Sequence, residues 1–202
     1  MEKKPRGRGE SLPQSVAEKF NNLYGAELTK VTYGDLPQDV KKHFESQSRK
    51  FILPETYHVG NFNKIYKFTH PNGDVTYVGQ QDKVYNTNDS TERLTFFADT
   101  RDGQMTGYLE LRFALTDLNK YFKNKPFVGF SRTNATFLRQ GLAKRRLEEA
   151  NAYSVSEHRL PLNSDSFVTE KARGVWERLM VEGKAEKYKE GDNERFRFVP
   201  SK

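Results

Sequence analysis

The segment 127–150 constrains the fold of this chain more than any other part of it. An apolar run, FVGF, is followed by a polar stretch, by Gly141, and then at once by residues with a helical period. The apolar positions near the 3.6-residue period are Leu138, Leu142, Ala143, Leu147 and Ala150. The pattern predicts a strand, a glycine-containing turn and a helix in direct succession.

A helix that begins directly after such a turn is suited to hold phosphate groups. The N–H groups of its first turn point outward, the helix dipole is positive there, and glycine lets the backbone approach a ligand. Basic side chains surround this turn, at Arg139, Lys144, Arg145 and Arg146. A solvated basic helix without any ligand explains the same residues equally well.

The charge distribution also favours an anionic partner. The net charge is +7, with ten Lys and Arg against seven Asp and Glu in residues 1–50, nine of each in 51–126, and fifteen against eleven in 127–202. The excess therefore lies at the two ends, which suits nucleic acid or a phosphorylated cofactor. Aromatic residues reach 13%, enough to build a real core.

Other classes of protein are excluded by composition. The absence of cysteine rules out disulfides, thiolate metal sites and cysteine nucleophiles. The four histidines lack ligand spacing, so we expect no metal site. No apolar run is long enough to span a bilayer and the N-terminus has no apolar signal core, so we expect a cytoplasmic protein without membrane contact.

The remaining elements are predicted from turn and cap signals. Helices are expected over 15–22, ended by Gly25, and over 38–48. Two hairpins, around Asn72-Gly73 and Asp102-Gly103, form an antiparallel meander within 57–113, because both pairs supply positive φ angles. A short strand at 159–165, an amphipathic helix over 172–180 ended by Gly183, and a hairpin around 191–193 complete the chain.

This order of elements resembles that of the GNAT acetyltransferase superfamily. FLRQGLAKRRLEEANAYS is similar to the family's acyl-CoA pyrophosphate loop and the helix after it, and RLPLNSDSFVTEKARGVWERLMVEGKAEKY to its next strand and helix. The resemblance covers 126–198 clearly and 57–113 loosely. It implies an α+β fold, with a mixed, mostly antiparallel sheet flanked by helices, in one domain over 14–202. Residues 1–13 have almost no apolar side chains, so we expect a flexible basic tail there.

The resemblance further implies an acyl-CoA-dependent N-acetyltransferase that uses acetyl-CoA or another acyl-CoA. Loop amides would bind the pyrophosphate and the preceding strand would bind the pantetheine arm. The residues implied are Phe130, Ser131, Thr133, Arg139, Gln140, Gly141, Leu142, Ala143 and Lys144. Glu110 is the candidate base. Two positions depart from the family pattern: Leu138 replaces the loop's Arg or Gln, and Trp176 replaces the Tyr that acts as general acid in many members.

The N-terminal tail carries a second, shorter resemblance. Lys4, Arg6 and Arg8, spaced by Pro and Gly, are similar to the core of an AT-hook, which lays arginines into the narrow minor groove of A·T-rich DNA. Three functions therefore remain open: an acetyltransferase acting on a protein, nucleic-acid-associated or small-molecule amine, a DNA-binding protein, and a non-catalytic GNAT-like protein. In the DNA-binding alternative, residues 137–198 would form a winged helix, with 168–182 as the recognition helix and 184–198 as the wing.

Overall fold

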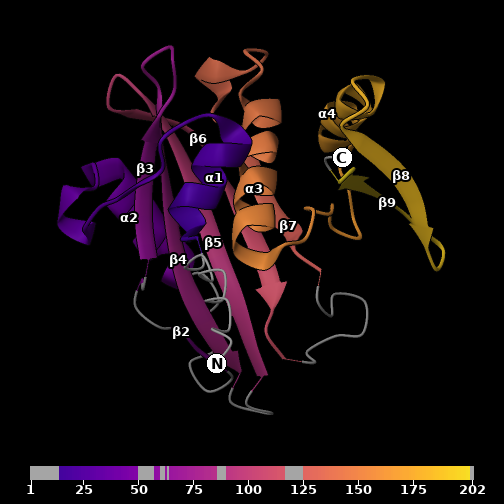
Figure 1. The fold of residues 1–202 in the computed structure, drawn as a ribbon, viewed down its shortest axis with the longest axis horizontal. Coiled ribbons are helices and arrows are strands. Elements are labelled where there is room, and N and C mark those ends of the chain that lie inside the picture. The colour runs from indigo at the N-terminus through magenta and orange to yellow at the C-terminus, as the bar shows by residue number, and fades with distance from the viewer. Residues whose placement is uncertain are drawn as a thin grey trace, which may run out of the picture.

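A mixed, mostly antiparallel sheet with helices on both faces confirms the predicted α+β class (Figure 1). The computed structural model describes residues 14–49, 57–59, 62, 64–85, 90–116 and 125–200. Helical elements are α1 (Val16–Tyr24), η1 (Tyr33–Asp35), α2 (Gln38–Arg49), η2 (Ala135–Phe137), α3 (Leu142–His158) and α4 (Glu170–Val181). Strands are β1 (Thr29–Lys30), β2 (Tyr57–Val59), β3 (Lys64–Thr69), β4 (Val75–Tyr85), β5 (Ser90–Arg101), β6 (Gln104–Ala114), β7 (Phe127–Thr133), β8 (Ala185–Glu190) and β9 (Asn193–Phe198).

The central sheet has the strand order β1-β3-β4-β5-β6-β7, with β2 also pairing to β4. Both predicted hairpins are present, as β3–β4 and β5–β6, and every pairing between these strands is antiparallel. The parallel part is an isolated bridge between Phe127 and Asn163. The long strands β4, β5 and β6 form its centre, as Figure 1 shows. This scaffold carries β7 at its edge, next to α3.

The two hairpin turns differ from each other in their backbone. Asp102 and Gly103 both have positive φ, at 49° and 77°, as the Asp-Gly signal predicts. In the other turn only Gly73 is left-handed, with φ 86°, so the prediction for Asn72 is wrong. Pro71 explains the difference, because its ring holds φ negative and favours an ordinary turn, closed here by Gly73 N–H donating to the His70 carbonyl at 2.9 Å.

Local capping signals set the helix ends. Ser15 and Glu18 form a capping box at the start of α1, and Gly25 ends it with φ 68°. Gly183 has φ 70° just after α4, as predicted, and its N–H donates to the Met180 carbonyl. Leu138 does not belong to a helix: α3 starts at Leu142, and the Leu138 side chain is 52% exposed. Its apparent place in the helical period was wrong because left-handed Gly141 separates it from α3.

Alternate residues of the strands build a core on each face of the sheet. On one face α1 and α3 cover Phe97 and Leu109, and α4 extends this core from beside α3, while on the other face α2 covers Phe96 and Ala98. Figure 1 shows α1 and α3 lying along the same face. Within the described ranges, no helix is both long and apolar enough to cross a membrane.

The C-terminal hairpin β8–β9 joins the body through β9. Phe198 N–H donates to the Leu162 carbonyl and Ser164 N–H donates to the Phe196 carbonyl, at 3.0 and 2.8 Å. The predicted strand at 159–165 is thus reduced to a few bonded residues around Asn163. The helix α3 packs on β5, β6 and β7 of the central sheet, whereas α4 contacts α3 and β8. Residues 137–198 therefore do not form the separate winged helix that the DNA-binding alternative requires.

Candidate functional site

Strand β7 carries a bulge at Gly129. Glu110 on β6 pairs with Phe130 and Leu111 pairs with Val128, which leaves Gly129 without a partner on β6. A Cβ atom on Gly129 would lie 2.5 Å from Arg112 Nε and 2.7 Å from Glu110 Oε1. Only glycine therefore lets the bulge sit over this pair of charged side chains.

The outer edge of β7 separates from its neighbour at the same place. Phe127 forms a parallel bridge with Asn163, in which Val128 N–H donates to the Asn163 carbonyl and Asn163 N–H donates to the Pro126 carbonyl, both at 2.9 Å. The next residue, Ser164, bonds to β9 instead. In the described part of the chain the pairing goes no further, so the outer edge of β7 is open from the bulge onward.

The chain then reaches the predicted turn, at the end of that open edge. Arg139 and Gly141 both have positive φ, at 64° and 76°. Nothing lies within 4 Å of a Cβ built on Gly141, so its backbone conformation, and not lack of space, requires glycine. Gly141 is the N-cap of α3, and among the described residues no side chain caps this helix. The first-turn amides of Leu142, Ala143 and Lys144 remain available to an anion.

The basic side chains near the turn do not act together, contrary to expectation. Lys144 Nζ pairs with Glu182, the C-cap residue of α4. Arg145 Nη1 lies 2.7 Å from Asp74 Oδ2, and Arg146 Nε lies 2.7 Å from Asp99 Oδ2. Arg139 is exposed, and no ion pair is found for it among the described residues.

Arg146 is a structural residue, and its side chain does not face the turn as its place in the sequence suggests. Its side chain and that of Asp99 are fully buried, and Arg146 Nη1 donates to the carbonyls of Tyr108 and Arg132 at 3.3 and 3.1 Å. A Cβ at Gly107 would lie 2.5 Å from the Arg132 carbonyl oxygen and would also clash with Arg146. The signal was present: Arg146 lies four residues after Leu142, on the apolar face of the helix.

A buried polar network continues beneath α3. Thr76 Oγ1 lies 3.0 Å from Asp99 Oδ1, 3.1 Å from Glu149 Oε2 and 2.8 Å from His70 Nε2. Burial, with the Asp99 charge, raises the pKa of Glu149 well above its usual value. Burial and the Arg145 charge lower the pKa of His70 to about 4, so its ring is neutral at pH 7.

The candidate base lies under the bulge. Glu110 is buried, at 3% exposure, and its Oε1 accepts a hydrogen bond from Arg112 Nε at 2.5 Å. Phe130, opposite Glu110, is half-exposed and stacks on Tyr108 with 5.7 Å between ring centroids. Ser131 and Thr133 follow on the open part of β7, of which Ser131 is exposed.

Trp176 belongs to the core. It is 3% exposed, stacks on Phe196 at 5.9 Å between centroids, and packs edge-on against Phe198. Its position in α4 is therefore used for packing, and an indole N–H does not release a proton at useful pH. Within the described residues there is also no cluster of His, Asp and Glu that would hold a metal ion. Lys4, Arg6 and Arg8 lie outside the described residues.

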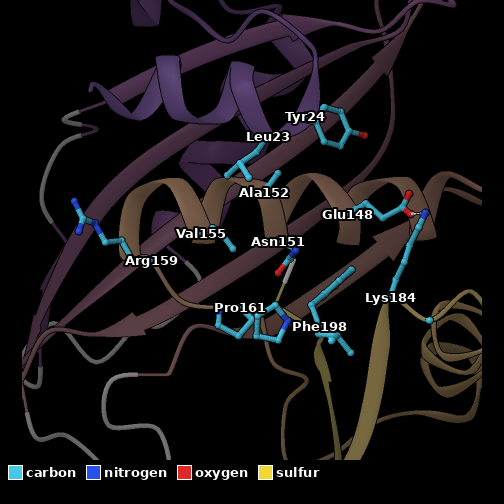
Figure 2. Close-up of a pocket in the computed structure, with 13 residues that line it drawn as sticks. Leu23, Tyr24, Glu148, Asn151, Ala152, Val155, Arg159, Pro161, Lys184 and Phe198 are labelled. Atoms are coloured by element: carbon cyan, nitrogen blue, oxygen red, sulfur yellow. Dashed lines mark hydrogen bonds and ion pairs between the residues drawn. The ribbon is translucent and has the colours of Figure 1, made fainter. Parts of the chain in front are cut away.

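A separate pocket of about 800 Å³ lies on the outer side of α3. Figure 2 shows Leu23 and Tyr24 of α1 on one side of the helix and Pro161 and Phe198 on the other. The Glu148–Lys184 ion pair, at 2.6 Å, closes one end. None of residues 138–144 lines it, so this pocket is distinct from the turn at Gly141.

Comparisons with known proteins add little. No protein-family model matches the sequence, and no curated protein does. Among solved structures, a provisionally named streptothricin acetyltransferase from Bacillus anthracis, in complex with acetyl coenzyme A, aligns with a TM-score of 0.39 and 9% identity. The alignment covers 86% of this chain and 97% of that chain. At these values the likeness establishes neither the fold nor the function of this chain.

Proposed function

We propose that this chain is an acyl-CoA-dependent N-acetyltransferase of the GNAT type. One observation carries the proposal: the open edge of β7 begins at a bulge and leads directly to an uncapped helix N-terminus with a left-handed glycine. An extended ligand with a diphosphate at one end suits this arrangement. Backbone groups of the strand can pair with an amide-containing arm, and the helix N–H groups can donate hydrogen bonds to the phosphate oxygens.

The residues fit an acyl-CoA in the following way. The amides of 139–144 take the pyrophosphate, and their approach to it depends on the φ of Gly141. Phe130, Ser131 and Thr133 lie along the open edge, where the pantetheine arm would pair. Exposed Arg139 adds the positive charge that Lys144, Arg145 and Arg146 do not supply with their side chains.

Acetyl-CoA, when bound, supplies a reactive thioester to an acceptor amine. A backbone N–H near the bulge of β7 would donate to the thioester oxygen and stabilise the charge that develops there. Glu110, beneath the bulge, would take a proton from the amine, and the Arg112 guanidinium holds its carboxylate in place. Trp176 supplies no proton, so the departing thiolate would take one from water or from the acetylated amine.

Titration calorimetry with acetyl-CoA at low salt tests the proposal. We expect saturable binding by the wild-type chain, and binding at least tenfold weaker in Gly141→Val, because a β-branched residue is strained at positive φ. Gly191→Val is the matched control, since Gly191 also has positive φ, 60°, with open space around it, but lies in the β8–β9 turn. Absence of binding by the wild-type chain, or equal loss in both variants, would refute the proposal.

A second function is favoured by the position of Trp176. Since this residue is buried in the core, the chain lacks the acid that many family members place in this helix. A GNAT-like protein that binds acyl-CoA without transferring the acyl group is the alternative. Acetyl transfer to any amine in a panel of peptides, polyamines and aminoglycosides would exclude it.

A further inference from the structure

Asp74 gathers an unusual number of donors just after the β3–β4 turn. Its side chain is 2% exposed. Arg101 donates Nε to Oδ1 at 2.8 Å and Nη2 to Oδ2 at 3.0 Å, and Arg145 donates Nη1 to Oδ2 at 2.7 Å. Asn72 Nδ2 adds a fourth bond at 3.1 Å. These bonds, those from Arg101 first, hold the pKa of Asp74 well below its usual range.

Both arginines lead from Asp74 to the turn at Gly141. Arg101 Nη1 donates to Gln140 Oε1 at 2.7 Å, and the Arg101 guanidinium lies 6.0 Å from the ring centroid of Phe137. Arg145 belongs to α3, and its N–H donates to the Gly141 carbonyl. One buried carboxylate is thus linked to residues on both sides of Gly141.

We propose that Asp74 is a positioning residue for the phosphate-binding turn, acting through Arg101 and Arg145. The inference rests on the proposed function for its ligand, which is the diphosphate of an acyl-CoA. Asp74 itself would not touch that ligand. It holds the turn in the conformation that directs the amides of 139–144 outward, so that binding requires no ordering of the loop.

Charge repulsion and positioning predict opposite changes in CoA affinity when the Asp74 carboxylate is removed. A carboxylate close to an anion site repels the anion, so Asp74→Asn on charge grounds should tighten CoA binding. If Asp74 positions the turn, Asp74→Asn should instead bind CoA about tenfold more weakly, because the turn loses the carboxylate that holds Arg101 and Arg145. The sign of the change therefore separates the two roles.

Two variants and a matched control test the inference. Arg101→Lys keeps the positive charge but loses the planar guanidinium that bonds to Asp74 and Gln140 at the same time. We therefore expect it to weaken CoA binding, as Asp74→Asn does. Asp82→Asn is the control, because Asp82 also accepts two hydrogen bonds from one arginine, Arg93, at 2.9 and 3.3 Å. We would measure the affinities of CoA and of pantetheine, which lacks the diphosphate, by calorimetry.

Hydrogen exchange of the bonded amides of the turn, those of Phe137, Leu138 and Arg145, followed by mass spectrometry, provides a readout without ligand. The inference is supported if Asp74→Asn and Arg101→Lys both show faster exchange there, weaker CoA binding and unchanged pantetheine binding. Asp82→Asn should show none of these changes. The inference is overturned if the two variants bind CoA more tightly, lose affinity for CoA and pantetheine equally, or do not differ from Asp82→Asn. If the wild-type chain binds no CoA, the proposed function fails, and the exchange rates alone decide whether Asp74 orders the turn.

Discussion

Replacement of Arg146 by methionine should destabilise the chain severely. The side chains of Arg146 and Asp99 have no exposed surface, and they meet at 2.7 Å. Arg146→Met leaves the Asp99 carboxylate buried beside Thr76 and removes the donor from two backbone carbonyls. Breaking a buried pair on one side costs about 3–5 kcal/mol. That is a large share of a total stability of about 5–15 kcal/mol.

Urea unfolding at 25 °C, followed by the fluorescence of the single tryptophan, measures the loss. The matched control is Arg173→Met, because Arg173 pairs with Glu194 at 3.1 Å with both side chains about 40% exposed. We expect it to cost less than about 1 kcal/mol. In the double variant Arg146→Met, Asp99→Leu, about 2 kcal/mol should return, since no buried charge remains. A cost for Arg146→Met no larger than that of the control, or strict additivity in the double variant, would show that the pair is not the anchor we infer.

Three further predictions concern the site and the network. Glu110→Gln should lower the rate of acetyl transfer by about 10²–10⁴-fold with little change in CoA affinity, and an unchanged rate would remove Glu110 from the mechanism. Since the pKa of His70 falls from 6.5 to about 4 on folding, the unfolded chain binds the extra proton. Stability should therefore drop by about 2–3 kcal/mol between pH 6.5 and pH 4, and His70→Gln should flatten that drop in urea titrations. Trp176→Tyr should not raise the rate, because the position faces the core; a faster variant would contradict this placement.

The candidate site was predictable where it depends on neighbours in sequence. Gly141 and the start of α3 lie where glycine and the helical period place them. Leu138 shows the limit, because its spacing matches the helix although left-handed Gly141 precedes the first helical residue. The contributions of Lys144, Arg145 and Arg146 could not be predicted either, since their carboxylate partners come from distant elements.

By itself, the sequence determined the features that need only a few adjacent residues. Ser15 and Gly25 bound a helix, and Asp102-Gly103 turns a hairpin, because capping bonds and positive φ angles act over four residues or fewer. The tertiary structure decided the bulge at Gly129, the end of the pairing between β7 and the Asn163 segment after Val128, and the link from Asp74 to the turn. Each of these depends on strand register or on charges brought together by packing. Residues that are paired across strands or by long-range ion pairs have no fixed spacing along the chain, so no local sequence pattern encodes these pairings.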